Sequence, residues 1–341
     1  MIEETVFIDF QEIKEVVKSK YGLEITNVAK IERGSANIYS LNNDKYILKE
    51  FQSKYKKEEI IKEIEVIKHL EKNDIKVPHY VKLINGDYCF VHKEKYIILQ
   101  EYIDGYTLEQ NGGNYFQTIE SAEYLGRIVK ALETINYDLS EADLSAWYSD
   151  ENFDKSIDEY NELIRWLDLE NETEKRIYDE LNEKIEMINS IRNSIDFEEM
   201  SKLSIKATHG DYSVMQFIYK EDKINAVIDF VSACKMPIVW ELLRSYSYID
   251  KDAKDGDFNI NTMIDYVKKF NEYVKLNEYD IKYMSYLYLL QLLNSSYGYK
   301  QYINNKSNIG LLNFAFLRTK ICKYLFNNAK LISQKLEEEL W

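Results

Sequence analysis

The sequence predicts an α+β protein with two lobes. Strand patterns and short polar turns dominate the first hundred residues, whereas helical spacing dominates from about residue 115 onward. A chain of 341 residues is also long enough to form two cores. We therefore expect a small β-rich N-terminal lobe over 1–103 and a larger, mostly helical C-terminal lobe over 104–341.

The elements of the first lobe follow from turn residues and periodicity. Helical spacing over 9–22 stops at Gly22, and three strands are expected over 25–51, with turns at Gly34–Ser35 and Asn42–Asp44. The segment 57–73 is a predicted helix because its isoleucines recur along one side. Strands return over 77–103, and Asp104–Gly105 breaks the pattern.

The second lobe is expected to be helical over 121–135, 153–169, 174–195 and most of 258–340. One strong β signal interrupts it: "QFIYK" and "NAVIDFV" flank the polar turn Glu221–Lys223. This pattern predicts a hairpin, with Asp211 before it and Asp229 at its end.

Composition excludes several classes of function. The net charge of −15 and the lack of a dense Lys/Arg block argue against nucleic acid as a partner. No apolar run approaches the roughly 20 residues that cross a bilayer, and the acidic start does not resemble a secretory signal. Three scattered cysteines indicate neither a disulfide framework nor a zinc site. We expect a cytoplasmic protein that does not bind membranes.

The polar residues around the hairpin are those that phosphoryl transfer requires. Magnesium prefers hard oxygen ligands, and a carboxylate can take up the proton of an attacking hydroxyl. A hairpin can bring Asp211 and Asp229 to the same edge, and Gln216 offers an amide oxygen between them.

"HGDYSVMQ" followed by "VIDF" resembles the signature of the aminoglycoside phosphotransferases and their relatives. This family has the protein-kinase-like fold and includes choline, homoserine and methylthioribose kinases and the spore-coat CotS-type proteins. The resemblance implies that Asp211 is the catalytic base and Asp229 a magnesium ligand. It extends to "ERGSANIYSLNNDKYILKEF", which is similar to the hairpin that covers the nucleotide and implies roles for Ser35 and Lys49.

Further along the chain, "ILQEYIDGYTLE" is similar to the hinge of these kinases, which implies that backbone groups of Glu101 and Ile103 meet adenine. Lys49 then needs an ion-pair partner on the predicted helix 57–73. Glu63 is favoured over Glu65 because Ile60 and Ile67 place it at the edge of the apolar face.

Two departures from the family pattern leave a choice open. Gln216 stands where the family has the Asn of a second metal site, and the covering hairpin contains Gly34 as its lone glycine. The first interpretation is a kinase that depends on magnesium and ATP, with GTP as the alternative nucleotide. It would act on a hydroxyl of an aminoglycoside-, choline- or homoserine-like acceptor. The alternative is a catalytically weak spore-coat-type protein that serves as a nucleotide-binding or assembly module and has spore-coat partners. The acidic segment 137–160 favours a cationic acceptor, or is simply solvated surface.

Overall fold

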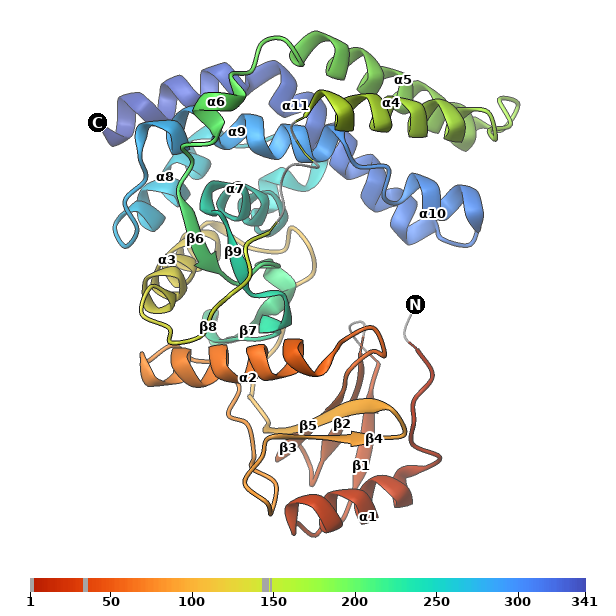
Figure 1. The fold of residues 1–341 in the computed structure, drawn as a ribbon, viewed down its shortest axis with the longest axis vertical. Helices are drawn as coiled ribbons and strands as arrows, with labels where there is room; N and C mark the ends of the chain where they lie inside the picture. Colours follow the sequence, from red (N-terminus) through yellow and green to blue (C-terminus); the bar gives the residue numbers. More distant parts are fainter. Residues whose placement is uncertain (1–2, 33–35, 143–146, 148) are drawn as a thin grey trace.

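The structure is a computed structural model that describes residues 3–32, 36–142, 147 and 149–341. It confirms the α+β fold with a β-rich N-terminal part and a larger helical part (Figure 1). Helix α2 lies between the sheet and the helical lobe. The exact division at residues 103 and 104 stays a prediction.

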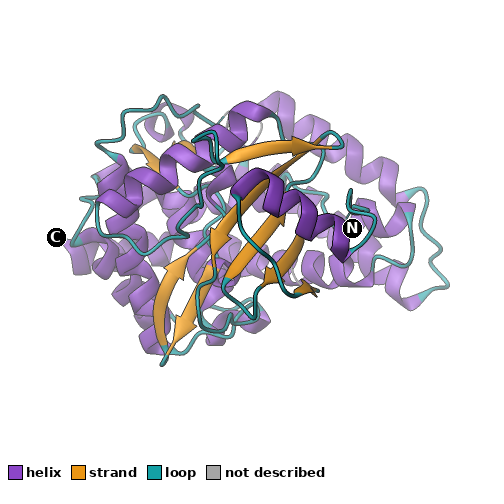
Figure 2. Ribbon diagram, turned by 90° about the horizontal axis from the view of Figure 1, so that it is seen from below, coloured by secondary structure: helices purple, strands orange, loops and turns teal. Residues whose placement is uncertain are grey.

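The N-terminal sheet has five strands in the order β1-β2-β3-β5-β4, and all neighbours run antiparallel. The turn predicted at Asn42–Asp44 is present, and its residues, like Lys93–Glu94, are in the left-handed region that tight hairpins use. The turn predicted at Gly34–Ser35 lies outside the described residues. Seen from below, the strands of the sheet lie side by side in front of the helices of the C-terminal lobe (Figure 2). The strands are β1 (Val28–Ile31), β2 (Asn37–Leu41), β3 (Tyr46–Glu50), β4 (Cys89–His92) and β5 (Lys95–Glu101).

One helix covers each face of this sheet. Alternate side chains of a strand point to opposite faces, so Ile97 and Leu99 join the core with α1 (Phe10–Tyr21), while Ile98 joins the core with α2 (Lys57–Lys72). Helix α1 ends at Gly22 as predicted, at a φ of 70°. The core on the α2 side continues into the helical lobe.

The C-terminal lobe is mostly helical, as expected. None of the described helices combines the length and the apolar character that crossing a bilayer requires. The helices are α3 (Tyr115–Leu132), α4 (Asp150–Ile164), α5 (Glu172–Ile191), α6 (Phe197–Met200), α7 (Ile238–Ile249), α8 (Ile260–Asn271), α9 (Glu278–Leu293), α10 (Tyr299–Asn304) and α11 (Ile309–Leu340), with short 3-10 turns η2 (Val214–Gln216), η3 (Phe230–Ser232) and η4 (Lys251–Asp255).

Two small sheets shape the centre of this lobe. The predicted hairpin is present as β7 (Phe217–Lys220) and β8 (Lys223–Val227). A second antiparallel pair, β6 (Ile205–Thr208) with β9 (Cys234–Pro237), was not predicted. Its two strands hold the chain on both sides of the hairpin, so the loops that carry Asp211 and Asp229 start from fixed positions.

Candidate active site

Lys49 lies on the face of β3 that is turned toward α2. It pairs across the sheet with Ile98, whose side chain joins the core on that face. Its ammonium group lies 4.5 Å from the centroid of the Phe51 ring. Strand alternation therefore aims this lysine away from the α1 side and toward the helical lobe.

Glu63 on α2 meets Lys49, as the sequence predicts. Glu63 is 1% exposed, and its Oε1 atom lies 3.4 Å from Lys49 Nζ. Glu65 instead pairs with Lys68 near the surface, at 2.8 Å. Burial raises the pKa of Glu63, and the attraction of Lys49 offsets only part of that effect.

Asp229 completes this cluster from a position 180 residues away in the chain, with its Oδ1 atom 2.8 Å from Lys49 Nζ. Its backbone is in the left-handed region, at φ 68° and ψ 58°. This conformation is unfavourable for a residue that has a Cβ atom, and it is typical of functional sites. Lys49 holds the pKa of Asp229 below its ordinary value, against the opposing effect of burial. Burial alone would lower the pKa of Lys49, but Asp229 and Glu63 outweigh it, and the pKa is raised.

Gln216 lies at the other end of the same hairpin, where η2 leads into β7. Its backbone carbonyl accepts a hydrogen bond from the N–H of Ile228 at 2.9 Å. Because Asp229 directly follows Ile228, this bond holds Gln216 close to Asp229 along the backbone. An amide oxygen and a carboxylate are hard ligands that suit magnesium. The described residues contain no group of three His, Cys, Asp or Glu side chains that could hold a metal alone.

The loop that carries Asp211 is fastened to the Asp229 loop by His209. This histidine is fully buried; its Nδ1 accepts from the N–H of Asp211 at 3.3 Å, and its Nε2 lies 3.0 Å from the carbonyl oxygen of Ile228. Together these bonds fix the tautomer, with the proton on Nε2. His209 is thus a structural link between the two carboxylates.

Asp211 has an ion-pair partner that the sequence analysis missed. Arg244, on α7, donates from Nη2 to Asp211 Oδ1 at 2.6 Å, while 45% of the Asp211 side chain stays exposed. Burial alone would lower the pKa of Arg244, but Asp211 outweighs it, and the pKa is raised. A lone arginine in the apolar helix "IVWELLRSYSYI" is the signal that could have revealed it.

The predicted hinge lies at the end of β5. Glu101 donates its N–H to the carbonyl of His79 at 2.9 Å, and Tyr102 donates to Lys45 at 3.0 Å. Within the described residues, the Glu101 carbonyl and the Ile103 N–H make no hydrogen bond, which leaves one acceptor and one donor for a base. Ser35 lies outside the described residues, so its role stays a prediction.

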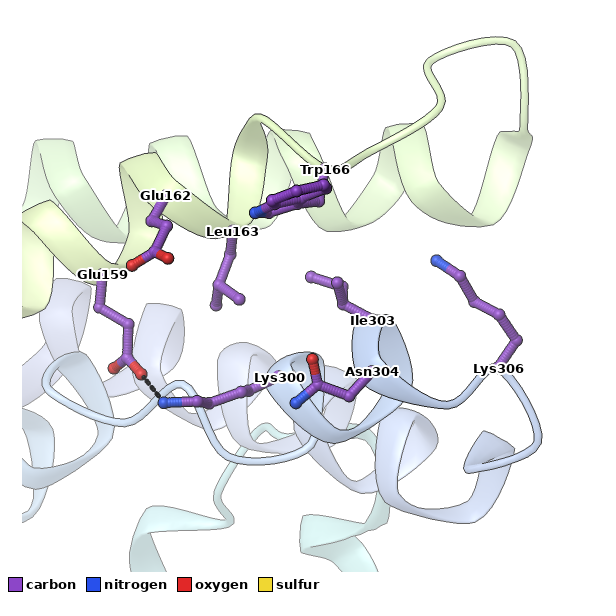
Figure 3. Close-up of a pocket in the computed structure, with 8 residues that line it drawn as sticks. All are labelled: Glu159, Glu162, Leu163, Trp166, Lys300, Ile303, Asn304 and Lys306. Carbon is purple, nitrogen blue, oxygen red and sulfur yellow. Dashed lines mark hydrogen bonds and ion pairs between the residues drawn. The ribbon is translucent and has the colours of Figure 1, made fainter.

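The acidic segment 137–160 is largely neutralised by basic side chains. Asp150 and Asp154 pair with Arg192, and Asp138 pairs with Lys235. A groove of about 490 Å³ between α4 and α10 carries Glu159, which pairs with Lys300 at 2.7 Å (Figure 3). These ion pairs favour solvated surface over a cation-binding wall.

Comparison with known proteins identifies the family of the chain. A sequence model of the phosphotransferase enzyme family (APH) matches residues 27–267. The chain belongs to this family. Among curated proteins, no sequence matches the chain significantly.

Solved structures share the fold of this phosphotransferase over nearly its whole length. The spectinomycin phosphotransferase APH(9)-Ia, in complex with ADP and spectinomycin, has 15% identity and a TM-score of 0.62 over 96% of this chain and 98% of its own. An aminoglycoside phosphotransferase from Alicyclobacillus acidocaldarius has 15% identity and a TM-score of 0.67, with 98% of both chains covered. Amicoumacin kinase hAmiN, in complex with AMP-PNP, Ca2+ and Ami, has 14% identity and a TM-score of 0.59 over 97% of this chain and 94% of its own. At such identities the likeness establishes the fold, not the acceptor.

Proposed function

We propose that this phosphotransferase transfers the γ-phosphoryl group of ATP to a hydroxyl group of a small molecule. One observation carries the proposal: Lys49, Glu63 and Asp229 meet within 3.4 Å although they come from a strand, a helix and a loop far apart in the sequence. A buried lysine held by two carboxylates can release one of them and bind phosphate oxygens in its place. Catalysis of this kind rests on positioning and charge neutralisation.

The side chains take the following roles in this proposal. Lys49 binds phosphates and is held by Glu63, while Asp211 orients the acceptor hydroxyl and takes up its proton. Asp229 and Gln216 bind magnesium, which when bound neutralises charge on the phosphates. The free backbone groups at Glu101 and Ile103 meet the base, and Ser35 covers the phosphates.

The acceptor is proposed to be an aminoglycoside-, choline- or homoserine-like alcohol, with ATP, or GTP in its place, as the donor and the cytoplasm as the compartment. Spectinomycin and amicoumacin in the related complexes support a small-molecule acceptor. A specific observation favours a second candidate, since Gln216 replaces the family's Asn at the metal site. In that alternative the chain is a catalytically weak spore-coat-type module that binds nucleotide and assembles with coat proteins.

Substitution of Asp211 tests the proposal. Asp211→Ala removes the base and should lower turnover by roughly 10²–10⁴-fold across a panel of hydroxyl acceptors. ATP binding, measured by calorimetry, should change little because Asp211 does not contact Lys49 or Asp229 in the described structure. Asp211→Asn is the matched control, because its amide oxygen still accepts from Arg244. Equal loss of turnover and ATP binding in both variants would contradict the role, and magnesium-dependent ATP binding without turnover in the wild type would favour the alternative.

A further inference from the structure

Buried nitrogen donors without partners lie on α7, which carries the Asp211 partner Arg244, and on α11. Four buried side-chain nitrogens in the described chain lack a hydrogen-bond partner, and three of them are Trp240 Nε1, Arg244 Nη1 and Arg318 Nε. The fourth belongs to Gln110. Because buried polar groups are normally satisfied, three such donors in one region need an explanation.

The three side chains are joined by direct contacts. The Arg244 guanidinium lies 5.2 Å from the Trp240 ring and 5.1 Å from the Tyr248 ring. Tyr248 contacts Phe314 at 5.7 Å between centroids, and Arg318 lies 5.6 Å from the Phe314 ring. A continuous arginine–aromatic wall thus runs from Asp211 to α11.

A cavity of about 360 Å³ adjoins this wall at the junction of α9 and α10. Its lining includes Trp147, Asn294, Ser295 and Tyr297, and the described residues that line it carry no charged side chain. Trp147 packs on Trp240 at 5.1 Å, and Ser295 Oγ accepts from Arg318 Nη1 at 3.0 Å. Two residues that line the cavity, Trp147 and Ser295, therefore contact the wall at Trp240 and at Arg318.

Positive charge behind the cavity is not neutralised by acids. Arg318 is 8% exposed and Lys184 is 2% exposed, and neither pairs with a carboxylate in the described part of the chain. Lys184 donates to the backbone carbonyl of Ser295 at 2.8 Å. Arg244 itself pairs with Asp211 at 2.6 Å, whereas Glu241 on α7 accepts from the Tyr212 N–H at 2.9 Å. Lys184 also donates to the carbonyl of Leu292 at 2.8 Å, so these cations have hydrogen-bond partners but no counter-charge. Buried charges without a counter-charge are costly, and an anion would supply it.

We propose that the acceptor carries a carboxylate, which binds to Arg244 and Trp240 beside the reacting hydroxyl, with Arg318 as a second cation. This inference rests on the proposed function and narrows its acceptors to homoserine-like compounds. Arg244 keeps 17% of its side chain exposed next to Asp211, and in this proposal the guanidinium rotates to bring the buried Nη1 to an acceptor held there. A planar guanidinium can serve two carboxylates at once, here Asp211 and the acceptor.

The proposed transfer forms one bond to phosphorus and breaks another. The acceptor oxygen forms a bond to the γ-phosphorus as the bond from that phosphorus to the β,γ-bridging oxygen breaks and ADP leaves. The hydroxyl proton goes to Asp211. The acceptor carboxylate takes no part in the chemistry, and its binding to Arg244 orients the hydroxyl toward Asp211.

Matched acceptor pairs test the proposal. L-homoserine and 3-amino-1-propanol differ by one carboxylate, as do L-serine and ethanolamine. We expect kcat/KM, measured by ADP release, to favour the carboxylate member of at least one pair by roughly tenfold or more, the effect of one charge-assisted hydrogen bond. Trp240→Phe keeps the ring and removes Nε1, and Arg318→Met keeps the stem and removes the charge. Each should raise KM for the carboxylate compound several-fold and leave KM for the amine unchanged.

A second readout does not depend on turnover. Tm is measured for wild type, Trp240→Phe, Arg318→Met and the control Trp166→Phe, a surface tryptophan 71% exposed in the other groove, with each compound present at millimolar concentration. A carboxylate-specific rise in Tm that is lost in Trp240→Phe and Arg318→Met but kept in Trp166→Phe supports the site. Equal effects of both members of each pair, or no effect, would overturn it.

The two proposals fail in different ways. Turnover of the amines alone overturns the carboxylate site and leaves the kinase proposal standing. No nucleotide-induced shift and no ADP release overturn the kinase proposal, whereas a carboxylate-specific rise in Tm would still support the anion site.

Discussion

Replacing Gly210 with alanine adds a methyl group where the chain leaves no room for one. Gly210 separates His209 from Asp211 and has a φ of 82°. A Cβ atom there would lie 2.0 Å from the carbonyl oxygen of Ser232, in the segment that follows Asp229. The left-handed backbone costs a residue with a Cβ atom about 1 kcal/mol, and overpacking against backbone costs about 1–3 kcal/mol more.

Gly210→Ala should therefore lower the free energy of unfolding by about 2–4 kcal/mol. At about 2 °C per kcal/mol for a chain of this size, Tm should fall by roughly 4–8 °C. Turnover should fall as well, because the clash pushes the Asp211 loop away from the Asp229 loop. The assays are thermal unfolding followed by circular dichroism and ADP release with any acceptor that the wild type phosphorylates.

Substitutions of two other glycines separate the cost of the left-handed backbone from the cost of the clash. Gly86 has a φ of 93° and open space around its Cβ position, so Gly86→Ala should show the backbone cost alone, about 1 kcal/mol. Gly310, in the first turn of α11, has neither a positive φ nor a neighbour within 4 Å, and Gly310→Ala should be neutral or stabilising. If Gly210→Ala melts like Gly86→Ala and keeps full turnover, the close approach of the two loops is refuted.

Three further predictions concern the charged and polar residues of the two lobes. Glu63→Gln keeps the shape of the side chain and removes its charge, so Lys49 is held less firmly and KM for ATP should rise roughly tenfold; an unchanged KM would contradict the pairing. Gln216→Asn shortens the side chain by one methylene, which reduces the rotamer entropy lost on binding metal, so half-maximal ATP binding should need several-fold less Mg2+; a higher requirement would argue against Gln216 as a ligand. Burial lowers the pKa of Lys184 from 10.5 to about 8. The unfolded chain then binds more protons than the folded one between these pH values, so stability should rise from about pH 8 to about pH 10.5, and urea unfolding should show this slope in the wild type and a smaller one in Lys184→Met.

Much of the site was predictable because its residues carry local signals. The alternation of β3, the apolar face of α2 and the turn residues of the β7–β8 hairpin lie within short windows, and they place Lys49, Glu63 and Asp229 on elements that meet. The resemblance supplied the order of these elements. The structure then added the tight backbone at Asp229, which no periodicity reveals.

What the sequence did not predict depends on contacts across long separations. Strands β6 and β9 have four residues each, and 25 residues lie between Thr208 and its partner Cys234, so neither strand stands out by itself. Arg244 meets Asp211 across 33 residues, and its spacing from the loop that carries Asp211 follows no pattern. The pairing of the acidic segment with Arg192 and Lys300 likewise exists only after the helices have packed.

The most direct test of the nucleotide site is thermal stabilisation by ATP and by GTP, with and without Mg2+, on the wild type and on Asp229→Ala. A ligand that binds only the folded state at 100 times its Kd stabilises it by about 2.7 kcal/mol, which corresponds to a rise in Tm of roughly 5 °C. We predict a rise of this size that requires Mg2+ in the wild type and is absent in Asp229→Ala. No rise with either nucleotide, or the same magnesium-dependent rise in Asp229→Ala, would contradict the proposed site.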